Sequence, residues 1–267
     1  AAVLFAVPVF AVDEAEVVIP GETPTYDPYT GEIWLQPTVV LAEQGPLSNS
    51  GNESQLLDVT LLMNTYGFGG QFLSDNRIAD DFTVPAGEMW DITRITLFAY
   101  QTSAGSGAST ISGVYLQVWD GIPGVSNLVW GDPGFGTNYM TASAWSGVYR
   151  TLESAPGATN RAIMANEVTP SPDLLLGAGT YYMAWMTDGS GSFSGPWINP
   201  VAASTDPVTG NGLQSLAGAA YNPCYDAGQS GVEQWQQGFP YVIEGDLTGG
   251  TPTETVSWGG LKATFSE

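Results

Sequence analysis

Short runs of β-forming residues separated by turn residues are the feature of this sequence that most restricts its fold. From residue 56 onward, segments rich in β-branched and aromatic residues alternate with clusters of Gly, Pro, Asn, Asp and Ser. No long amphipathic helix pattern lies between these segments, which disfavours a parallel α/β sheet. The predicted strands are 56–63, 78–84, 90–100, 111–119, 127–130, 161–168, 180–187 and 239–247. The sequence therefore predicts an all-β fold, an antiparallel β-sandwich of the jelly-roll type with one core.

The run 111–119 shows how such a strand would divide its side chains. Successive side chains of a strand point to opposite faces, so residues two apart share a face. One face carries Val114, Leu116 and Val118, and the other carries Tyr115, Gln117 and Trp119. We expect the aliphatic face to pack in the core and the other face to meet solvent.

The chain divides by composition into four segments. Residues 1–11, AAVLFAVPVFA, are an apolar run that is either a signal-peptide remnant or a retained donor strand. Residues 12–55 form an acidic, proline-rich extended arm with one edge strand at 32–36, followed by the sandwich at 56–250 and a C-terminal tail or terminal strand at 251–267. If the apolar run is retained, alternate side chains would insert into another copy: Val3, Phe5, Val7 and Val9.

The composition excludes several classes of function. The sequence has no His, one Cys and a single lysine, Lys262, so it can hold no catalytic Ser-His-Asp triad, intramolecular disulfide or P-loop. A formal net charge of −22 repels phosphate groups, which disfavours nucleic acid as a partner. No apolar run is long enough for a membrane-spanning helix.

The segment 78–132 resembles a domain found in secreted bacterial surface proteins. The resemblance lies in IADDFTVPAGEMW, ITRITLFAY, VYLQVWDGIPG and LVWGD, with weaker echoes in LGAGTYYMAW and GFPYVIEGDL. It implies an extracellular β-sandwich module with a jelly-roll-like fold, whose relatives mostly lack an assigned activity and often lie beside adhesive or sorting segments. The resemblance carries no catalytic residues to this chain.

Four carboxylates form the best candidate for a metal site: Asp80, Asp81, Glu244 and Asp246. The first and last strands of many sandwiches are neighbours, so these acids could meet at one edge and bind Ca²⁺ through oxygen ligands. The alternative is that they are solvated or cap turns, because adjacent residues of a strand point to opposite faces.

Aromatic residues are the candidates for a ligand-binding surface. Nine Trp and twelve Tyr could supply a stacking platform for sugars, although most aromatic residues of a sandwich belong to its core. The candidates on loops or outer faces are Tyr100, Tyr115, Trp119, Trp145, Trp197 and Trp235.

Three functional hypotheses follow. The first is a non-catalytic extracellular structural or adhesive surface protein, which binds other copies of itself and assembles into a fibre by exchange of a terminal strand. The alternative is a secreted carbohydrate-binding module, with Ca²⁺ as an optional stabilising ion, cell-surface glycans as partners and no other cofactor. The third is an acid-only glycoside hydrolase, which would need two carboxylates about 5 to 9.5 Å apart across a cleft.

Overall fold

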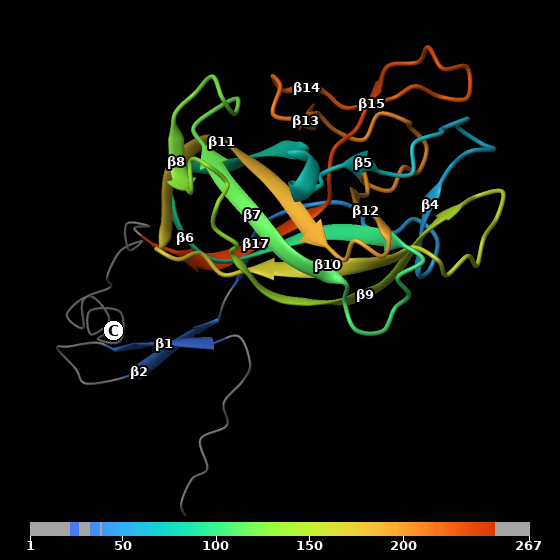
Figure 1. Cartoon of the computed structure of the whole chain (residues 1–267). Helices are drawn as coiled ribbons and strands as arrows, with labels where there is room; N and C mark the ends of the chain where they lie inside the picture. Colours follow the sequence, from blue (N-terminus) through green and yellow to red (C-terminus); the bar gives the residue numbers. More distant parts are fainter. Residues whose placement is uncertain (1–21, 27–32, 38, 249–267) are drawn as a thin grey trace, which may run out of the picture. The chain divides into compact units, whose positions relative to one another are not determined.

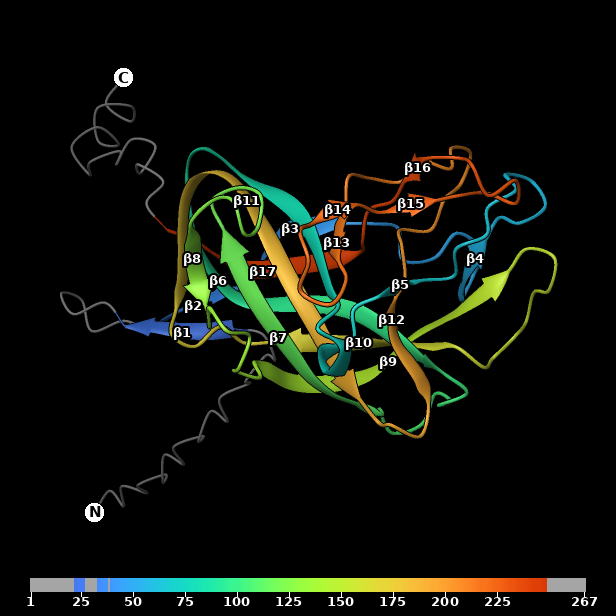
Figure 2. The same cartoon turned by 45° about the horizontal axis from the view of Figure 1, so that its top comes forward.

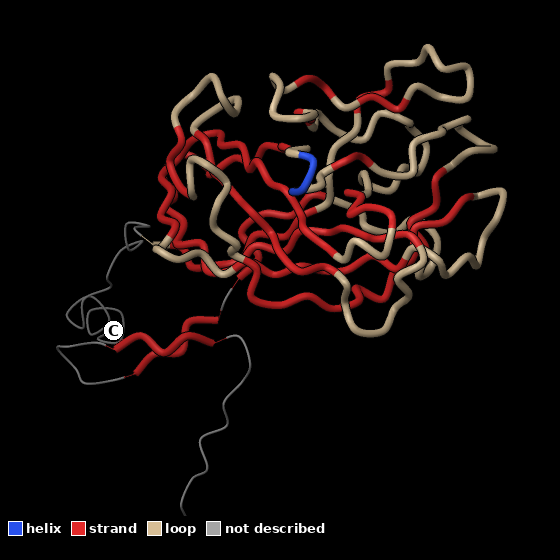
Figure 3. The backbone as a smooth tube through the Cα atoms, viewed as in Figure 1, coloured by secondary structure: helices blue, strands red, loops and turns tan. Residues whose placement is uncertain are grey.

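The computed structural model describes residues 22–26, 33–37 and 39–248, and these are almost entirely strands and loops (Figures 1 and 3). They fall into two compact units, of which the first ends at residue 38 and the second begins at residue 39. The first unit contains β1 (Glu22–Tyr26) paired antiparallel with β2 (Ile33–Pro37), which is the strand predicted at 32–36. Within the described ranges, no helix has the length and apolar character needed to cross a membrane.

The second unit is a sandwich-like arrangement of strands, as predicted, with one 3₁₀ turn, η1 (Phe72–Ser74). Its sheet has the order β4-β9-β10-β6-β11-β7-β8, and β17 lies between β6 and β3. The named ladders are antiparallel except for the β4–β9 pair, which is parallel. The strands are β3 (Val39–Gln44), β4 (Glu53–Leu56), β5 (Phe68–Gly69), β6 (Arg77–Thr102), β7 (Ile111–Trp119), β8 (Leu128–Gly131), β9 (Met140–Leu152), β10 (Ala162–Val168), β11 (Leu174–Gly189), β12 (Ser194–Ile198), β13 (Leu213–Ser215), β14 (Asn222–Pro223), β15 (Tyr225–Asp226), β16 (Trp235–Gln236) and β17 (Tyr241–Leu247).

Strands β6 and β11 bend together and run through both halves of the sandwich (Figure 2). The segments predicted as separate strands at 78–84 and 90–100 are two arms of β6, joined through Gly87 at φ +87°. The first arm pairs with β11 and β13, and the second pairs with β10, β11, β12 and β17. The prediction of two separate strands was wrong here because Pro85 and Gly87 lie within one continuous strand.

The main core lies between the two halves of the sheet. It contains large rings that contact one another edge to face: the Phe239 centroid lies 5.5 Å from that of Phe68 and 5.9 Å from that of Trp185. Strand β7 has the predicted bounds, and its aliphatic residues are fully buried in this core: Val114, Leu116 and Val118. Burial of these side chains stabilises the fold by about 1.5–3 kcal/mol each.

Three other predictions differ from the structure. Only Leu56 of the predicted strand 56–63 lies in a strand, because the chain then turns and the amides of Leu61 and Met63 both donate to the carbonyl oxygen of Leu57. Strand β9 was missed because its Ala, Ser, Thr and Gly residues are a weak β signal, and its pairing with β10 decides its conformation. Strands β3 and β4 fall within the arm predicted at 12–55, but they pair with β17 and β9.

Gly245 permits the close approach of β17 and β6, at a register shift between the two strands. A Cβ atom at this position would collide with the backbone carbonyl oxygen of Asp91. We expect Gly245→Ala to lower the free energy of unfolding by about 1–3 kcal/mol in chemical denaturation. Gly177→Ala is the matched control in β11, where no neighbouring atom would meet the added Cβ, and equal effects of the two variants would contradict the prediction.

Candidate functional site

The outer face of β7, β11 and β6 carries a row of residues with half-buried side chains. Tyr182 of β11 lies directly opposite Trp119 of β7 on one side and Asp81 of β6 on the other. Cross-strand partners point to the same face of a sheet, so these three side chains share the surface that faces away from the main core. Beside this row, the exposed Thr83 and Thr180 hydroxyls lie 3.1 Å apart. We name the surface formed by Asp81, Trp119 and Tyr182 the aromatic face.

Other rings of the cluster that includes Trp119 and Tyr182 cover the neighbouring part of the same outer face. Phe72 of η1 stacks on Tyr115, with the ring centroids 3.8 Å apart and the planes 8° from parallel. Phe135 is buried beside them, and Tyr221 packs against the same cluster. Since Phe72 covers one face of the Tyr115 ring, Tyr115 supports the cluster instead of providing the open shelf that was predicted.

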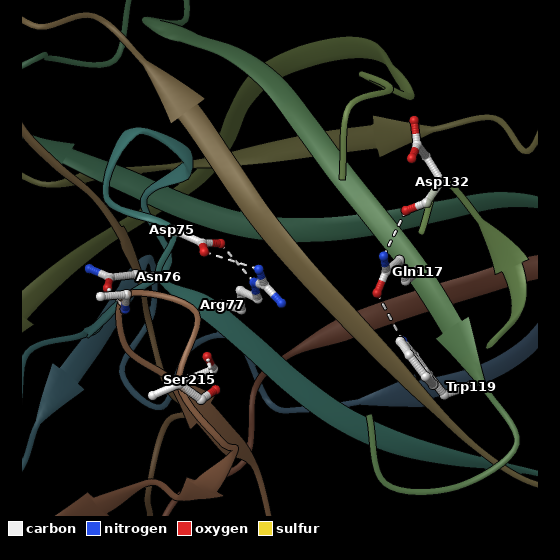
Figure 4. Close-up of polar contacts among 9 residues, drawn as sticks. Asp75, Asn76, Arg77, Gln117, Trp119, Asp132 and Ser215 are labelled. Atoms are coloured by element: carbon white, nitrogen blue, oxygen red, sulfur yellow. Dashed lines mark hydrogen bonds and ion pairs between the residues drawn. The ribbon is translucent and has the colours of Figure 1, made fainter. Parts of the chain in front are cut away.

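The indole of Trp119 is held by a chain of hydrogen bonds (Figure 4). Its Nε1 donates to Oε1 of Gln117 at 3.0 Å, and Nε2 of Gln117 donates to the carbonyl oxygen of Asp132 at 2.6 Å. Gln117 is buried, so its amide is fixed by these two contacts. Trp119 is therefore pre-positioned, which lowers the entropy cost of binding a ligand against it.

A charged group borders the same face at the start of β6 (Figure 4). Arg77 makes a bidentate pair with Asp75, with Nε–Oδ1 and Nη2–Oδ2 distances of 2.8 and 3.0 Å, and its guanidinium lies 4.9 Å from the Phe135 ring centroid. The backbone of Asp75 also accepts from the Gly218 amide, which ties this group to the loop between β13 and β14. The alternation rule could have placed Tyr182 on an outer face, but no local pattern singles out Arg77 or Tyr221.

The remaining predicted aromatic residues lie apart from this face. Tyr100 is 2% exposed, so its proposed role as a ligand shelf was wrong, because its ring packs with Phe98 and Ile163 in a core cluster. Trp197 packs against that cluster, and Trp235 packs against another one. Trp145 is 37% exposed and donates through Nε1 to the carbonyl oxygen of Val148.

Two of the four predicted metal ligands, Asp80 and Glu244, are engaged by other groups. Asp80 is fully buried, and its carboxylate accepts hydrogen bonds from Gln44 and from the amides of Phe239 and Asp81. Glu244 forms a bidentate ion pair with Arg94 at 2.5 and 2.7 Å.

Asp246 lies opposite Asp91 in the ladder between β17 and β6. Burial, followed by the charges of Asp173 and Asp246, raises the pKa of Asp91. Among the residues that the structure describes, no three His, Cys, Asp or Glu side chains are grouped to hold a metal ion. The geometry thus differs from the predicted calcium site, since Asp80 and Glu244 are engaged by other groups.

The predicted assembly strand, with Val3, Phe5, Val7 and Val9, lies outside the described residues and stays a prediction. A pocket of about 410 Å³ lies apart from the aromatic face, between the end of β3 and the start of β17, and its lining includes Leu47, Phe98 and Val242. A comparison with protein-family models finds none that matches this chain, and a comparison with curated protein sequences also finds no match.

Proposed function

We propose that this chain is a non-catalytic extracellular adhesive protein that binds neutral glycan chains on the aromatic face. The observation that carries the proposal is the pairing of Trp119 and Tyr182 on neighbouring strands, both half-buried and both on the outer side of the sheet. Two such rings side by side give a sugar chain an apolar surface against which the C–H faces of its rings can pack.

Polar groups around the rings fit the same class of ligand. Asp81 can accept hydrogen bonds from sugar hydroxyls, and the Thr83 and Thr180 hydroxyls can donate or accept them. A few polar groups around an apolar contact are what fixes the orientation of a small ligand. The net charge of −22 favours neutral sugars over anionic ones.

The carboxylates nearest to Trp119 suit binding better than hydrolysis. Hydrogen bonds from the Asn127 side chain and amide lower the pKa of Asp120, and those from the Gly134 amide and the Thr137 hydroxyl lower the pKa of Asp132. A glycosidase needs a general acid with a raised pKa, which is the opposite shift. Asp120 and Asp132 therefore lack the raised pKa that a general acid requires.

The extracellular location and the surface role rest on the resemblance of residues 78–132 to secreted surface domains.

Assembly by strand exchange, with a second copy as partner, is the second candidate function. The observation that favours it is the edge position of β3, whose only strand partner within the described part of the chain is β17. An edge strand offers unpaired backbone groups to an added strand.

Substitution of the aromatic face tests the glycan proposal. We expect Trp119→Ala and Tyr182→Ala each to weaken binding about tenfold or more, because each removes one stacking surface, equivalent to about 1.4 kcal/mol. The measurement is isothermal titration calorimetry with soluble cello-, manno- and chito-oligosaccharides. Tyr225→Ala is the matched control, since Tyr225 is 39% exposed and lies outside the face. Unchanged affinity in Trp119→Ala, or absence of binding to every neutral oligosaccharide, would contradict the proposal.

A further inference from the structure

A pocket of about 290 Å³ lies beside the aromatic face. Its walls come from the loop after β7, residues 122–125, and from the loop between β13 and β14, residues 218–221, and Arg77 of β6 completes the lining. The first loop follows Trp119 directly, and Tyr221 packs in the same cluster as Trp119. A ligand that lies on Trp119 can therefore extend one group into this pocket.

Two polar groups of the pocket have unused hydrogen-bonding capacity. Nε and Nη2 of Arg77 are engaged by Asp75, whereas Nη1 donates no hydrogen bond to any residue that the structure describes. The hydroxyl of Tyr221 is buried beside the Arg77 guanidinium, and it donates a hydrogen bond to no acceptor among the described residues. A buried polar group without a partner is costly, and a ligand atom that satisfies it gains the corresponding free energy. Both groups can donate, so together they call for an acceptor oxygen.

The opposite wall of the pocket is apolar although it meets solvent. Ile122 is 47% exposed and Val125 is 83% exposed, with Pro123 between them. Gly124 adopts φ +77° in this turn, a conformation that residues with a side chain rarely take. The wall offers contact area to a methyl-sized group.

We propose that this pocket binds the acetamido group of an N-acetylated hexosamine, which deepens the proposed function and rests on it. The acetamido carbonyl oxygen accepts from Nη1 of Arg77 and from the Tyr221 hydroxyl, and the methyl group packs on Ile122 and Val125. The group is neutral, which matches a site where Asp75 already balances the charge of Arg77. The volume lies at the lower end of the range for small-molecule sites, which suits one sugar substituent or ring.

The test compares two neutral trisaccharides by isothermal titration calorimetry: N-acetylchitotriose and cellotriose, which carries a hydroxyl where the former carries an acetamido group. We expect the wild-type chain to bind N-acetylchitotriose at least tenfold more tightly. Tyr221→Phe and Arg77→Gln should each reduce this preference to about threefold or less. Tyr221→Phe keeps the ring and removes a hydroxyl that donates to no acceptor among the described residues, so the fold is expected to persist. Tyr225→Phe, at an exposed site elsewhere, should leave the preference unchanged.

The outcomes separate the two proposals. Equal binding of both trisaccharides, lost in Trp119→Ala, would overturn the acetamido assignment and leave the aromatic face as a glycan site. A preference for N-acetylchitotriose that survives both Tyr221→Phe and Arg77→Gln would also overturn the assignment to this pocket. Absence of binding to either trisaccharide, or to longer neutral chains, would overturn both proposals.

Discussion

Replacing Arg150 by methionine is expected to lower the free energy of unfolding by at least about 3 kcal/mol. Arg150 of β9 is 1% exposed and donates to three backbone carbonyl oxygens. Nε donates to Tyr66 at 2.8 Å, Nη2 to Thr65 at 3.2 Å, and Nη1 to Ser54 at 3.3 Å. Burial lowers the pKa of Arg150 to about 10, so the side chain remains charged at neutral pH.

The cost arises from the carbonyl groups that the substitution leaves behind. Methionine fills much of the same volume but donates no hydrogen bond, and each buried unsatisfied carbonyl costs about 1–3 kcal/mol. The measurement is chemical denaturation of both proteins, with the slope of the transition compared to verify two-state unfolding.

Arg161→Ala is the matched control for Arg150→Met. The Arg161 guanidinium lies 4.1 Å from the ring centroid of Tyr66, and such a contact near the surface is worth about 0.5–1 kcal/mol. A loss below 1 kcal/mol in Arg150→Met would show that water satisfies the carbonyl groups and that the arginine does not organise the loop at residues 64–67.

The second large effect is a dependence of stability on pH that comes from Asp80. Burial raises the pKa of this carboxyl from 3.8 to about 7, despite hydrogen bonds from the Phe239 amide at 2.6 Å, the Asp81 amide at 3.0 Å and Nε2 of Gln44 at 2.8 Å. Between these two pH values the folded chain keeps a proton that the unfolded chain has released. The stabilisation from this proton is complete below pH 3.8 and is lost as the pH rises to about 7.

The expected magnitude is about 4 kcal/mol, from about three pKa units at 1.36 kcal/mol each. We expect the difference in unfolding free energy between the wild type and Asp80→Asn to fall by this amount between pH 4 and pH 8, since asparagine does not titrate. Taking the difference cancels the contribution of the other acidic residues. Ser215→Ala removes a buried uncharged group and should cost the same at every pH. A constant difference for Asp80→Asn would mean that the three hydrogen bonds outweigh burial and keep Asp80 ionised.

The sequence anticipates the elements in which local pattern and tertiary environment agree. Strand β7 has the predicted bounds because its period-two alternation matches a strand that packs one face in the core. The same alternation predicts that Tyr115 and Trp119 lie on the outer face. The pattern gave a wrong strand at 56–63, where apolar residues occupy a turn that packs against Trp235 and Ala203. Apolar content alone does not distinguish a strand from a turn whose side chains are buried.

The candidate site shows the limit of this kind of prediction. Trp119 was predicted from its own strand, but Tyr182 joins it only because β11 pairs with β7 in a register that opposes the two rings. Tyr100 was predicted on the same grounds as Trp119 and is buried, since β10 and β12 bring other side chains over it. Whether an outward-facing ring meets solvent therefore depends on elements distant in sequence.

Residue order by itself determined the all-β class, the positions of strands such as β7, β10 and β17, the acidic charge and the absence of histidine-dependent chemistry, because these follow from composition and from the local two-residue period. Only the tertiary structure decided which rings share a surface, that Asp80 and Glu244 are engaged by other groups, and that Arg77 and Tyr221 line one pocket. The physical reason is that register, strand order and loop packing are set by contacts between segments far apart in the chain, which no local pattern encodes.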